Sequence, residues 1–204
     1  MEAQIKHLKK DKTLKKIIER VGEIKLNKNR DLYLALLEAI VSQQLSVKAA
    51  DTIWKRFLAL FKNEYPEAKL LLKMKDDKLR SAGLSYQKAG YLKNIALFSI
   101  KQTLDYKKLK NKSNEEMIEY LIQIKGVGRW TVEMLLMFSL NREDVFPKDD
   151  LGIQNGIKML YDISSNNKKE LHAEMERISE SWKPYRTLAC RYIWRSKDMN
   201  VFGL

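Results

Sequence analysis

The chain has 204 residues, a length that suits one or at most two domains with cores of their own. Its 39 Lys and Arg against 26 Asp and Glu give a formal net charge of +13 at pH 7, which favours a polyanionic partner or an anionic membrane surface. A hydrophobic content of 45% argues against intrinsic disorder.

The single cysteine, Cys190, excludes an internal disulfide, a cysteine-rich zinc site and a four-cysteine iron–sulfur cluster. We therefore expect no metal and no cofactor. A reducing, intracellular setting follows, either the cytoplasm with the bacterial nucleoid or a nucleus. The most apolar stretch, residues 32–41, is about half of the ~20 residues that cross a bilayer, so no membrane span is predicted.

Helix-favouring residues fill the segments between only three prolines and eight glycines, so the sequence predicts an all-α fold. Apolar residues recur at helical spacing over residues 14–21 and again from residue 32, where a buried central helix is predicted to continue, with breaks, through Phe61. Ser85 can cap a later helix, and Ser113-Asn-Glu-Glu116 fits a capping box. Pro184 suits the first position of a last helix.

A pair of glycines lies between two predicted helices, in the segment Ile124-Lys-Gly-Val-Gly-Arg-Trp-Thr131. Gly126 and Gly128 can adopt positive φ and leave the backbone open to a phosphate. The N–H groups that begin the second helix, Val132–Leu140, would bind that phosphate with help from the helix dipole. Val127 would point inward and fix the turn. Taken alone, Gly-x-Gly is equally compatible with an ordinary tight turn.

This segment resembles the helix-hairpin-helix of DNA-binding proteins, whose Leu-Pro-Gly-Val-Gly hairpin holds the DNA backbone without reading bases. Lys125 replaces the proline and could add a phosphate contact. Binding of this kind is independent of sequence and sensitive to salt. The resemblance implies DNA contacts at Lys125, Gly126, Val127, Gly128, Arg129 and Thr131.

An acidic pair, Asp149 and Asp150, stands directly before an apolar helical segment, Leu151–Tyr161. On its own the pair predicts an N-cap. Together with the hairpin, it resembles the signature of the helix-hairpin-helix base-excision DNA glycosylases, in which a catalytic aspartate stands at the start of the next helix. Asp150 aligns with that catalytic aspartate, whereas Asp149 is expected to cap the helix or to face solvent.

Three further segments resemble elements of the same superfamily. Residues 39–46 resemble its Gln-Gln loop, residues 83–89 its Gly-Leu-Ser-x-x-Lys-Ala element, and residues 182–194 the Trp-x-Pro-Trp/Tyr-Arg-Ser motif of its terminal helix. The match extends over roughly residues 30–197. Within the superfamily the chain looks most like 3-methyladenine DNA glycosylase II in a compact form.

The resemblance implies an all-α fold of two helical subdomains with an active-site cleft between them. The first subdomain is expected to span residues 30–147 and to contain the hairpin. The second is expected to combine residues 1–29 with residues 148–204.

Trp130 stands two residues after the second hairpin glycine, where the bifunctional members of the superfamily carry a lysine that attacks the sugar C1′. The resemblance therefore implies a hydrolase that does not cut the strand. A cationic base such as 3-methyladenine or 7-methylguanine leaves as a neutral molecule and needs no general acid. Asp150 alone could then support cleavage by facing the oxocarbenium-like sugar.

A cationic base also favours an aromatic pocket, because an indole face attracts a cation by about 0.5 to 2 kcal/mol. By resemblance, Trp130 and Trp194 occupy pocket positions. Met134 and Leu151 stand where longer bacterial members carry aromatic residues, so the breadth of substrates is open.

A base inside a duplex must rotate out to reach such a pocket, and a wedge residue then fills its place. The resemblance puts this wedge in the loop of Gln43, Gln44 and Leu45, where Gln44 and Leu45 are both candidates. Lys148 and Arg186 are expected to contact phosphates.

The sequence thus predicts a monofunctional glycosylase for alkylated purines that acts as a monomer on damaged double-stranded DNA. Three alternatives share some of these features: a glycosylase for deaminated or oxidised bases, a non-catalytic DNA-damage-binding protein, and a basic helical protein that docks on anionic membranes. The last alternative accounts only for the charge.

Overall fold

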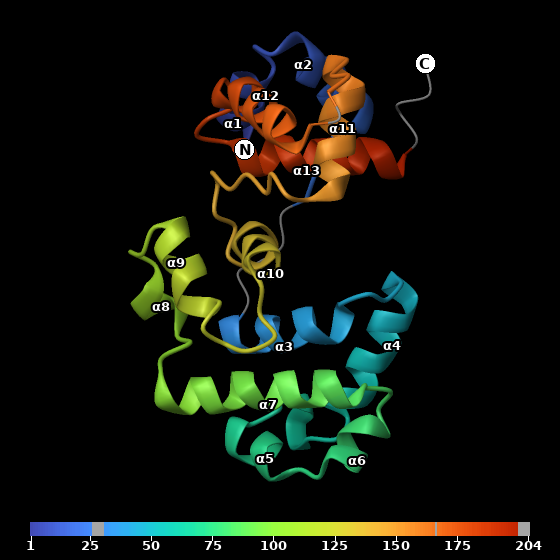
Figure 1. Ribbon diagram of the computed structural model, residues 1–204, viewed down its shortest axis with the longest axis vertical. Coiled ribbons are helices and arrows are strands. Elements are labelled where there is room, and N and C mark those ends of the chain that lie inside the picture. The colour runs from blue at the N-terminus through green and yellow to red at the C-terminus, as the bar shows by residue number, and fades with distance from the viewer. Residues whose placement is uncertain (26–30, 166, 200–204) are drawn as a thin grey trace. The chain divides into compact units, whose positions relative to one another are not determined.

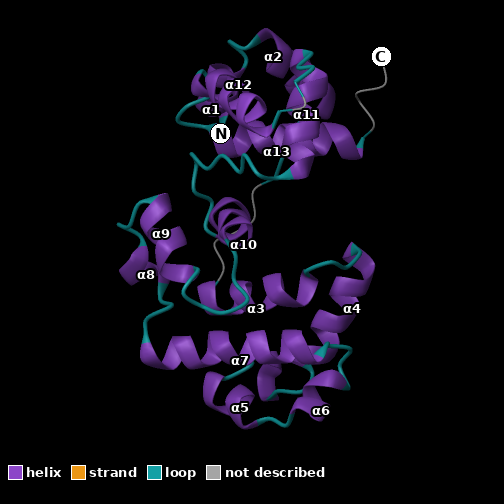
Figure 2. Cartoon of the chain, in the orientation of Figure 1, coloured by secondary structure: helices purple, strands orange, loops and turns teal. Residues whose placement is uncertain are grey.

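The computed structural model describes residues 1–25, 31–165 and 167–199, and these residues form helices joined by turns and loops without any strand (Figures 1 and 2). The predicted all-α class is therefore confirmed. The chain divides into two compact units: unit 1 is Met1–Asn27 with Asn141–Leu204, and unit 2 is Lys28–Leu140. The boundary expected at residues 29–30 lies outside the described residues, and the second division falls after Leu140 instead of Pro147.

Unit 2 is built around α7 (Tyr86–Lys101), which lies between α3 on one side and α5 and α6 on the other (Figure 1). The side chains of Leu36, Leu37 and Ile40 on α3 are fully buried, which confirms the predicted central helix. The remaining elements follow in chain order: α3 (Leu32–Ser42), α4 (Val47–Leu58), η1 (Lys62–Glu64), α5 (Ala68–Lys73), α6 (Asp76–Arg80), α8 (Tyr106–Leu109), α9 (Asn114–Leu121), α10 (Arg129–Met134) and the π-helical turn η2 (Leu135–Ser139).

Local capping determines where two of these helices begin. The Ser85 hydroxyl accepts a hydrogen bond from the Lys88 N–H and caps α7. At α9, the Ser113 N–H donates to Glu116 Oε2 and the Glu116 N–H donates to Ser113 Oγ, so the predicted capping box is present. Because these bonds satisfy N–H groups that lack a partner inside the helix, the sequence alone fixes both helix starts.

Unit 1 contains α1 (Glu2–Leu8), α2 (Lys12–Val21), α11 (Leu151–Tyr161), α12 (Lys168–Glu180) and α13 (Arg186–Asp198). Helix α13 packs against both α2 and α11. The prediction that Pro184 opens α13 is wrong, because a turn closed by the Tyr185 N–H and the Trp182 carbonyl, 2.8 Å apart, delays the helix to Arg186.

The Asp11 carboxylate connects α2 to the rest of unit 1. Its Oδ1 caps α2 by accepting the N–H groups of Thr13 and Leu14. Its Oδ2 accepts the Tyr161 hydroxyl at 2.8 Å and the indole N–H of the fully buried Trp182 at 3.0 Å. Burial and the nearby Asp11 charge together raise the pKa of Tyr161. One carboxylate therefore joins a helix start, a helix end and the turn before α13.

No helix in the described ranges is both long enough and apolar enough to cross a membrane.

Replacing Asp11 with alanine should lower the free energy of unfolding by about 3 kcal/mol, because a helix cap and hydrogen bonds to a charged group are lost together. Urea denaturation followed by circular dichroism measures the change. Asp77→Ala is the matched control, since the Asp77 side chain is 86% exposed and its loss should cost less than about 0.5 kcal/mol. Equal midpoints for the two variants would contradict the role given to Asp11.

Candidate functional site

The two hairpin glycines in unit 2 differ in backbone conformation and in the space available for a side chain. Gly126 has φ of +103°, and a Cβ there would lie 2.3 Å from Cγ of Tyr91, so no other residue fits without rearrangement. Gly128 has φ of −99° and is the N-cap of α10, and a Cβ there would meet nothing within 4 Å. Positive φ is thus found at Gly126 and not at Gly128. Val127 is 5% exposed and points inward as predicted.

A side chain from α7 and one from the residue that follows α3 contact the carbonyls of the hairpin. Asn94 donates to the Lys125 carbonyl at 3.1 Å, and the amide of Gln43 lies 3.5 Å from the Gly126 carbonyl oxygen. The Lys125 side chain itself is exposed. Gly128 is exposed and adds no side chain, so the surface at the start of α10 is open at this position, and a helix N-terminus attracts anions.

The two remaining hairpin residues predicted to contact DNA are engaged within unit 2. The Arg129 guanidinium makes a bidentate pair with Glu115, both distances being 2.7 Å, and its Nε lies 3.1 Å from Glu133. The Glu115 carboxylate raises the pKa of Arg129. Thr131 is buried, being 5% exposed, so its hydroxyl is not on the surface where a phosphate would lie.

A lysine that sequence reasoning left without a role holds the predicted wedge loop. The Lys88 ammonium donates to the carbonyls of Val41 at 2.7 Å and Gln43 at 2.8 Å, and burial lowers its pKa. These contacts place a positive charge at the C-terminal end of α3, where the helix dipole is negative. The next residues, Gln44 with φ of +56° and Leu45, are exposed.

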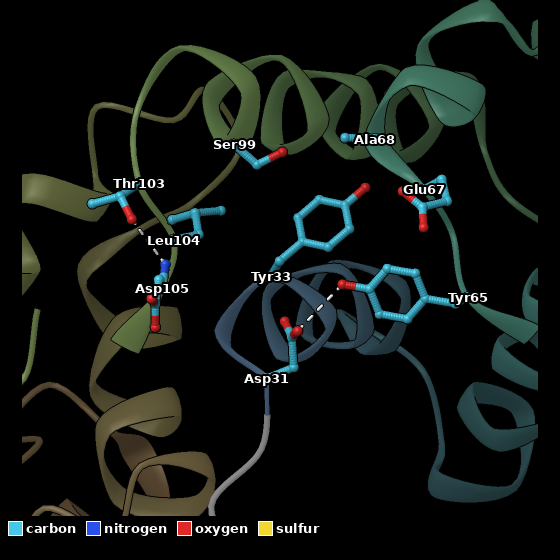
Figure 3. Close-up of a pocket in the computed structure, with 9 residues that line it drawn as sticks. All are labelled: Asp31, Tyr33, Tyr65, Glu67, Ala68, Ser99, Thr103, Leu104 and Asp105. Atoms are coloured by element: carbon cyan, nitrogen blue, oxygen red, sulfur yellow. Dashed lines mark hydrogen bonds between the residues drawn. The ribbon is translucent and has the colours of Figure 1, made fainter. Parts of the chain in front are cut away.

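A hollow in unit 2, with a volume of about 410 Å³, is lined by acidic residues (Figure 3). Asp31, Glu67 and Asp105 line it beside two tyrosines. Burial and the Asp31 carboxylate raise the pKa of Tyr65 to about 12. Because a negative potential repels phosphates, this hollow is not a candidate for contact with nucleic acid.

In unit 1, Asp150 is the N-cap of α11 and is 9% exposed. Its Oδ1 accepts the Ile153 N–H at 2.8 Å and the indole N–H of Trp194 at 2.9 Å. A carboxylate at a helix N-terminus is stabilised by the helix dipole, and two donors on one oxygen fix its orientation. The N-cap expected from the sequence is confirmed, and Asp150 provides it.

Gly152, which sequence reasoning did not single out, lies next to this carboxylate. A Cβ there would be 2.8 Å from Nε1 of Trp194 and 3.0 Å from Oδ1 of Asp150. The available signal was a glycine in the first turn of a predicted helix, where glycine is unfavourable.

Asp149 differs from Asp150 in its exposure and in its partners. Its side chain is 47% exposed and lies 2.8 Å from the Lys168 ammonium. His172 Nε2 is 3.7 Å away. The hydrogen bond from Lys168 is the main cause of a lowered pKa at Asp149. Asp149 therefore faces solvent, which is one of the two roles expected for it, while the other role, capping the helix, belongs to Asp150.

The two predicted phosphate contacts of unit 1 form ion pairs within the protein. The Lys148 ammonium lies 2.6 Å from Glu176. The Arg186 guanidinium makes a bidentate pair with Asp144 at 2.6 and 2.8 Å. A phosphate would have to displace these carboxylates.

Thr187, beside Arg186, fastens the loop that leads to Asp150. Its N–H donates to the Glu143 carbonyl at 3.0 Å, and its hydroxyl donates to the Arg142 carbonyl at 2.6 Å. The Val145 N–H donates to the same hydroxyl oxygen at 3.0 Å. These bonds explain why the loop belongs to unit 1 and why arginine and threonine open α13.

The four predicted base-pocket residues are divided between the units. Trp130, 48% exposed, and the half-buried Met134 lie on α10 in unit 2. Trp194, half-buried on α13, and Leu151, 71% exposed, lie in unit 1. Within the part of the chain that the structure describes, no group of three or more His, Cys, Asp or Glu side chains could hold a metal ion.

Comparison with known proteins identifies the family. The family model described as "HhH-GPD superfamily base excision DNA repair protein" matches residues 37–184. The chain therefore belongs to the HhH-GPD superfamily, in agreement with the resemblance seen in its motifs.

Two similar proteins are named for the excision of 3-methyladenine from DNA. DNA-3-methyladenine glycosylase 1 of Schizosaccharomyces pombe is 39% identical over 194 residues, which are 93% of this chain and 84% of that protein. The DNA-3-methyladenine glycosylase of Saccharomyces cerevisiae is 31% identical over 206 residues, covering 86% of this chain and 70% of that protein.

Solved structures agree with this assignment. The 3-methyladenine DNA glycosylase of Schizosaccharomyces pombe, in complex with abasic DNA, superposes with a TM-score of 0.84 at 38% identity over 97% of each chain. The DNA-3-methyladenine glycosidase of Bacillus halodurans has a TM-score of 0.82 at 34% identity, covering 97% of this chain and 89% of that one.

Gly126→Ala should destabilise the protein by about 2 to 4 kcal/mol, because alanine combines an unfavourable φ with a clash against Tyr91. Gly128→Ala should change stability by less than about 1 kcal/mol, since space is available and φ is ordinary. Urea unfolding of both variants measures the difference. Equal losses would contradict the distinct roles of the two glycines.

Proposed function

We propose that the chain is a monofunctional DNA glycosylase that hydrolyses the N-glycosidic bond of alkylated purines in duplex DNA and leaves an abasic site. The observation that carries the proposal is the Asp150 carboxylate, held at the start of α11 by a backbone N–H and an indole N–H. Relatives and solved structures named for 3-methyladenine excision support the substrate class.

The reaction breaks the bond between the sugar C1′ and the base nitrogen, and its electron pair leaves with the base. A cationic alkylated purine departs as a neutral molecule, so no second carboxylate is needed as an acid. Asp150 stabilises the positive charge that develops on the sugar. Water then bonds to C1′ and releases a proton, for which the carboxylate is a suitable acceptor.

Strand cleavage through a covalent intermediate needs an amine at the position of Trp130. An indole cannot form a Schiff base with the sugar. The proposed enzyme therefore stops at the abasic site.

Duplex DNA is held through its backbone. The exposed Lys125 and the open surface at Gly128, at the N-terminus of α10, form an anion site that reads no base. One of the two exposed residues Gln44 and Leu45 supplies the wedge. The protein acts as a monomer, and its DNA substrate places it in the nucleoid or the nucleus.

Asp150→Asn should lower the single-turnover rate of base release by at least about 100-fold, because the charge that faces the sugar is lost. Asparagine still offers an Oδ1 acceptor and is a good N-cap, so the fold should persist. The measurement is release of 3-methyladenine or 7-methylguanine from methylated duplex DNA, with strand breaks scored before and after hot alkali.

Asp149→Asn is the matched control, and its rate should stay within about 2-fold of wild type, as for a surface substitution. Breaks that appear only after alkali support the monofunctional reaction. Undiminished base release by Asp150→Asn, or wild-type protein that binds DNA and releases no base, would contradict the proposal.

Trp130→Leu should slow excision of 7-methylguanine by roughly 2- to 30-fold, the rate equivalent of a cation–π contact. Excision of the neutral base hypoxanthine should fall less, and Trp130→Phe should lie between. Rates on duplexes that carry one lesion each test this. Faster wild-type excision of hypoxanthine or uracil than of 7-methylguanine would instead favour a glycosylase for deaminated bases.

A further inference from the structure

Gly152 occupies the first turn of α11 beside the Asp150 carboxylate and the Trp194 indole. Its backbone has no positive φ that would call for glycine. A Cβ there would lie 2.8 Å from Nε1 of Trp194, 3.0 Å from its Cδ1 and 3.0 Å from Oδ1 of Asp150. The 2.8 Å distance is shorter than a carbon atom tolerates, and at 3.0 Å the neighbouring atom has to give way slightly. The missing side chain is therefore what gives the indole access to the carboxylate.

We propose that Gly152 is a positioning residue for base excision: without a side chain, it lets the Trp194 N–H bind and orient the Asp150 carboxylate. The inference rests on the proposed function of Asp150 and extends it to a residue that touches no substrate. It also accounts for glycine at a helical position where glycine costs about 1 kcal/mol relative to alanine.

Local bonding determines which group moves when a side chain is added at Gly152. Oδ1 of Asp150 is bound at 2.8 Å to the Ile153 N–H of the same helical turn, so the backbone of α11 holds the carboxylate. Trp194 reaches the site from a different helix, α13, and is only half-buried. An added methyl group therefore displaces the indole and breaks its 2.9 Å hydrogen bond to Asp150.

Loss of the hydrogen bond between Trp194 and Asp150 should slow the chemical step of base release. Without the indole, the Asp150 carboxylate loses one of the donors that orient it, and small errors in the placement of a reacting group slow a reaction strongly. The hairpin lies in unit 2, so binding to undamaged duplex should not depend on Gly152.

The kinetic experiment compares Gly152→Ala, Trp194→Phe and the double variant with wild type. Each single change should lower the single-turnover rate of base release about 10- to 100-fold, as for a lost hydrogen bond to a charged group. The Kd for undamaged duplex should stay within about 2-fold. If Gly152 acts through Trp194, the double variant should be no slower than Trp194→Phe.

Gly90→Ala is the matched control, because Gly90 also lies within a helix, α7, and a Cβ there would meet nothing within 4 Å. Its rate of base release should equal that of wild type.

A second measurement does not depend on turnover. The chain has four tryptophans, and the indole N–H signal missing from the ¹H–¹⁵N spectrum of Trp194→Phe identifies Trp194. In wild type this proton should be shifted downfield and exchange slowly with solvent, as a hydrogen-bonded proton does. Gly152→Ala should move the signal upfield and speed exchange.

An unchanged indole signal in Gly152→Ala would overturn the inference, and so would losses that add in the double variant. A slowed reaction with the indole signal in its original position would overturn it as well. Wild-type protein that shows the expected indole signal but releases no base would contradict the function proposed for Asp150, while the contact geometry around Gly152 would still be supported.

Discussion

Unit 1 depends on carboxylates that are held at helix starts by tryptophan N–H groups. Asp11 accepts the first N–H groups of α2 and the indole of Trp182, and Asp150 accepts the Ile153 N–H and the indole of Trp194. Removing a carboxylate from water is unfavourable unless donors replace the water. The donors to Asp11 come from other parts of unit 1, so this carboxylate joins helices. Asp150 instead lies beside a glycine, and the indole that donates to it is only half-buried. The same chemical arrangement thus serves architecture at one helix and the proposed catalysis at another.

Unit 2 depends instead on backbone groups. The hairpin can bring N–H groups to an anion because Gly126 lies directly against the Tyr91 ring and Gly128 leaves open space. Lys88 satisfies the carbonyls at the end of α3, which allows the chain to turn into the loop of Gln44. At the hairpin, Asn94 of α7 donates to the Lys125 carbonyl. At the end of α3, Lys88 of α7 donates to the main-chain carbonyls of Val41 and Gln43. That helix therefore supports both elements proposed to contact DNA.

The sequence predicted the features that short-range chemistry determines. The caps at Ser85 and Ser113 and the inward Val127 follow from residues within a few positions of one another. The sequence analysis gave no role to Lys88 and Thr187, although both lie in the motifs that it quoted, and it did not single out Gly152. In each case a partner (Val41, Arg142 or Trp194, respectively) stands more than 40 positions away along the chain. The roles of Asp150, Trp130 and Trp194 came from family resemblance, since an aspartate before a helix predicts only a cap.

Net charge does not show which basic side chains are already paired with carboxylates. The sequence predicts phosphate contacts at Arg129, Lys148 and Arg186. Arg129, Lys148 and Arg186 each hold a carboxylate at 2.7 Å or less, so a phosphate that approaches them exchanges one anion for another. Such an exchange gains little free energy. The start of α10 is a helix N-terminus, whose dipole attracts anions and is fixed before a ligand arrives. These three side chains should therefore add less to DNA binding than the net charge of the chain suggests.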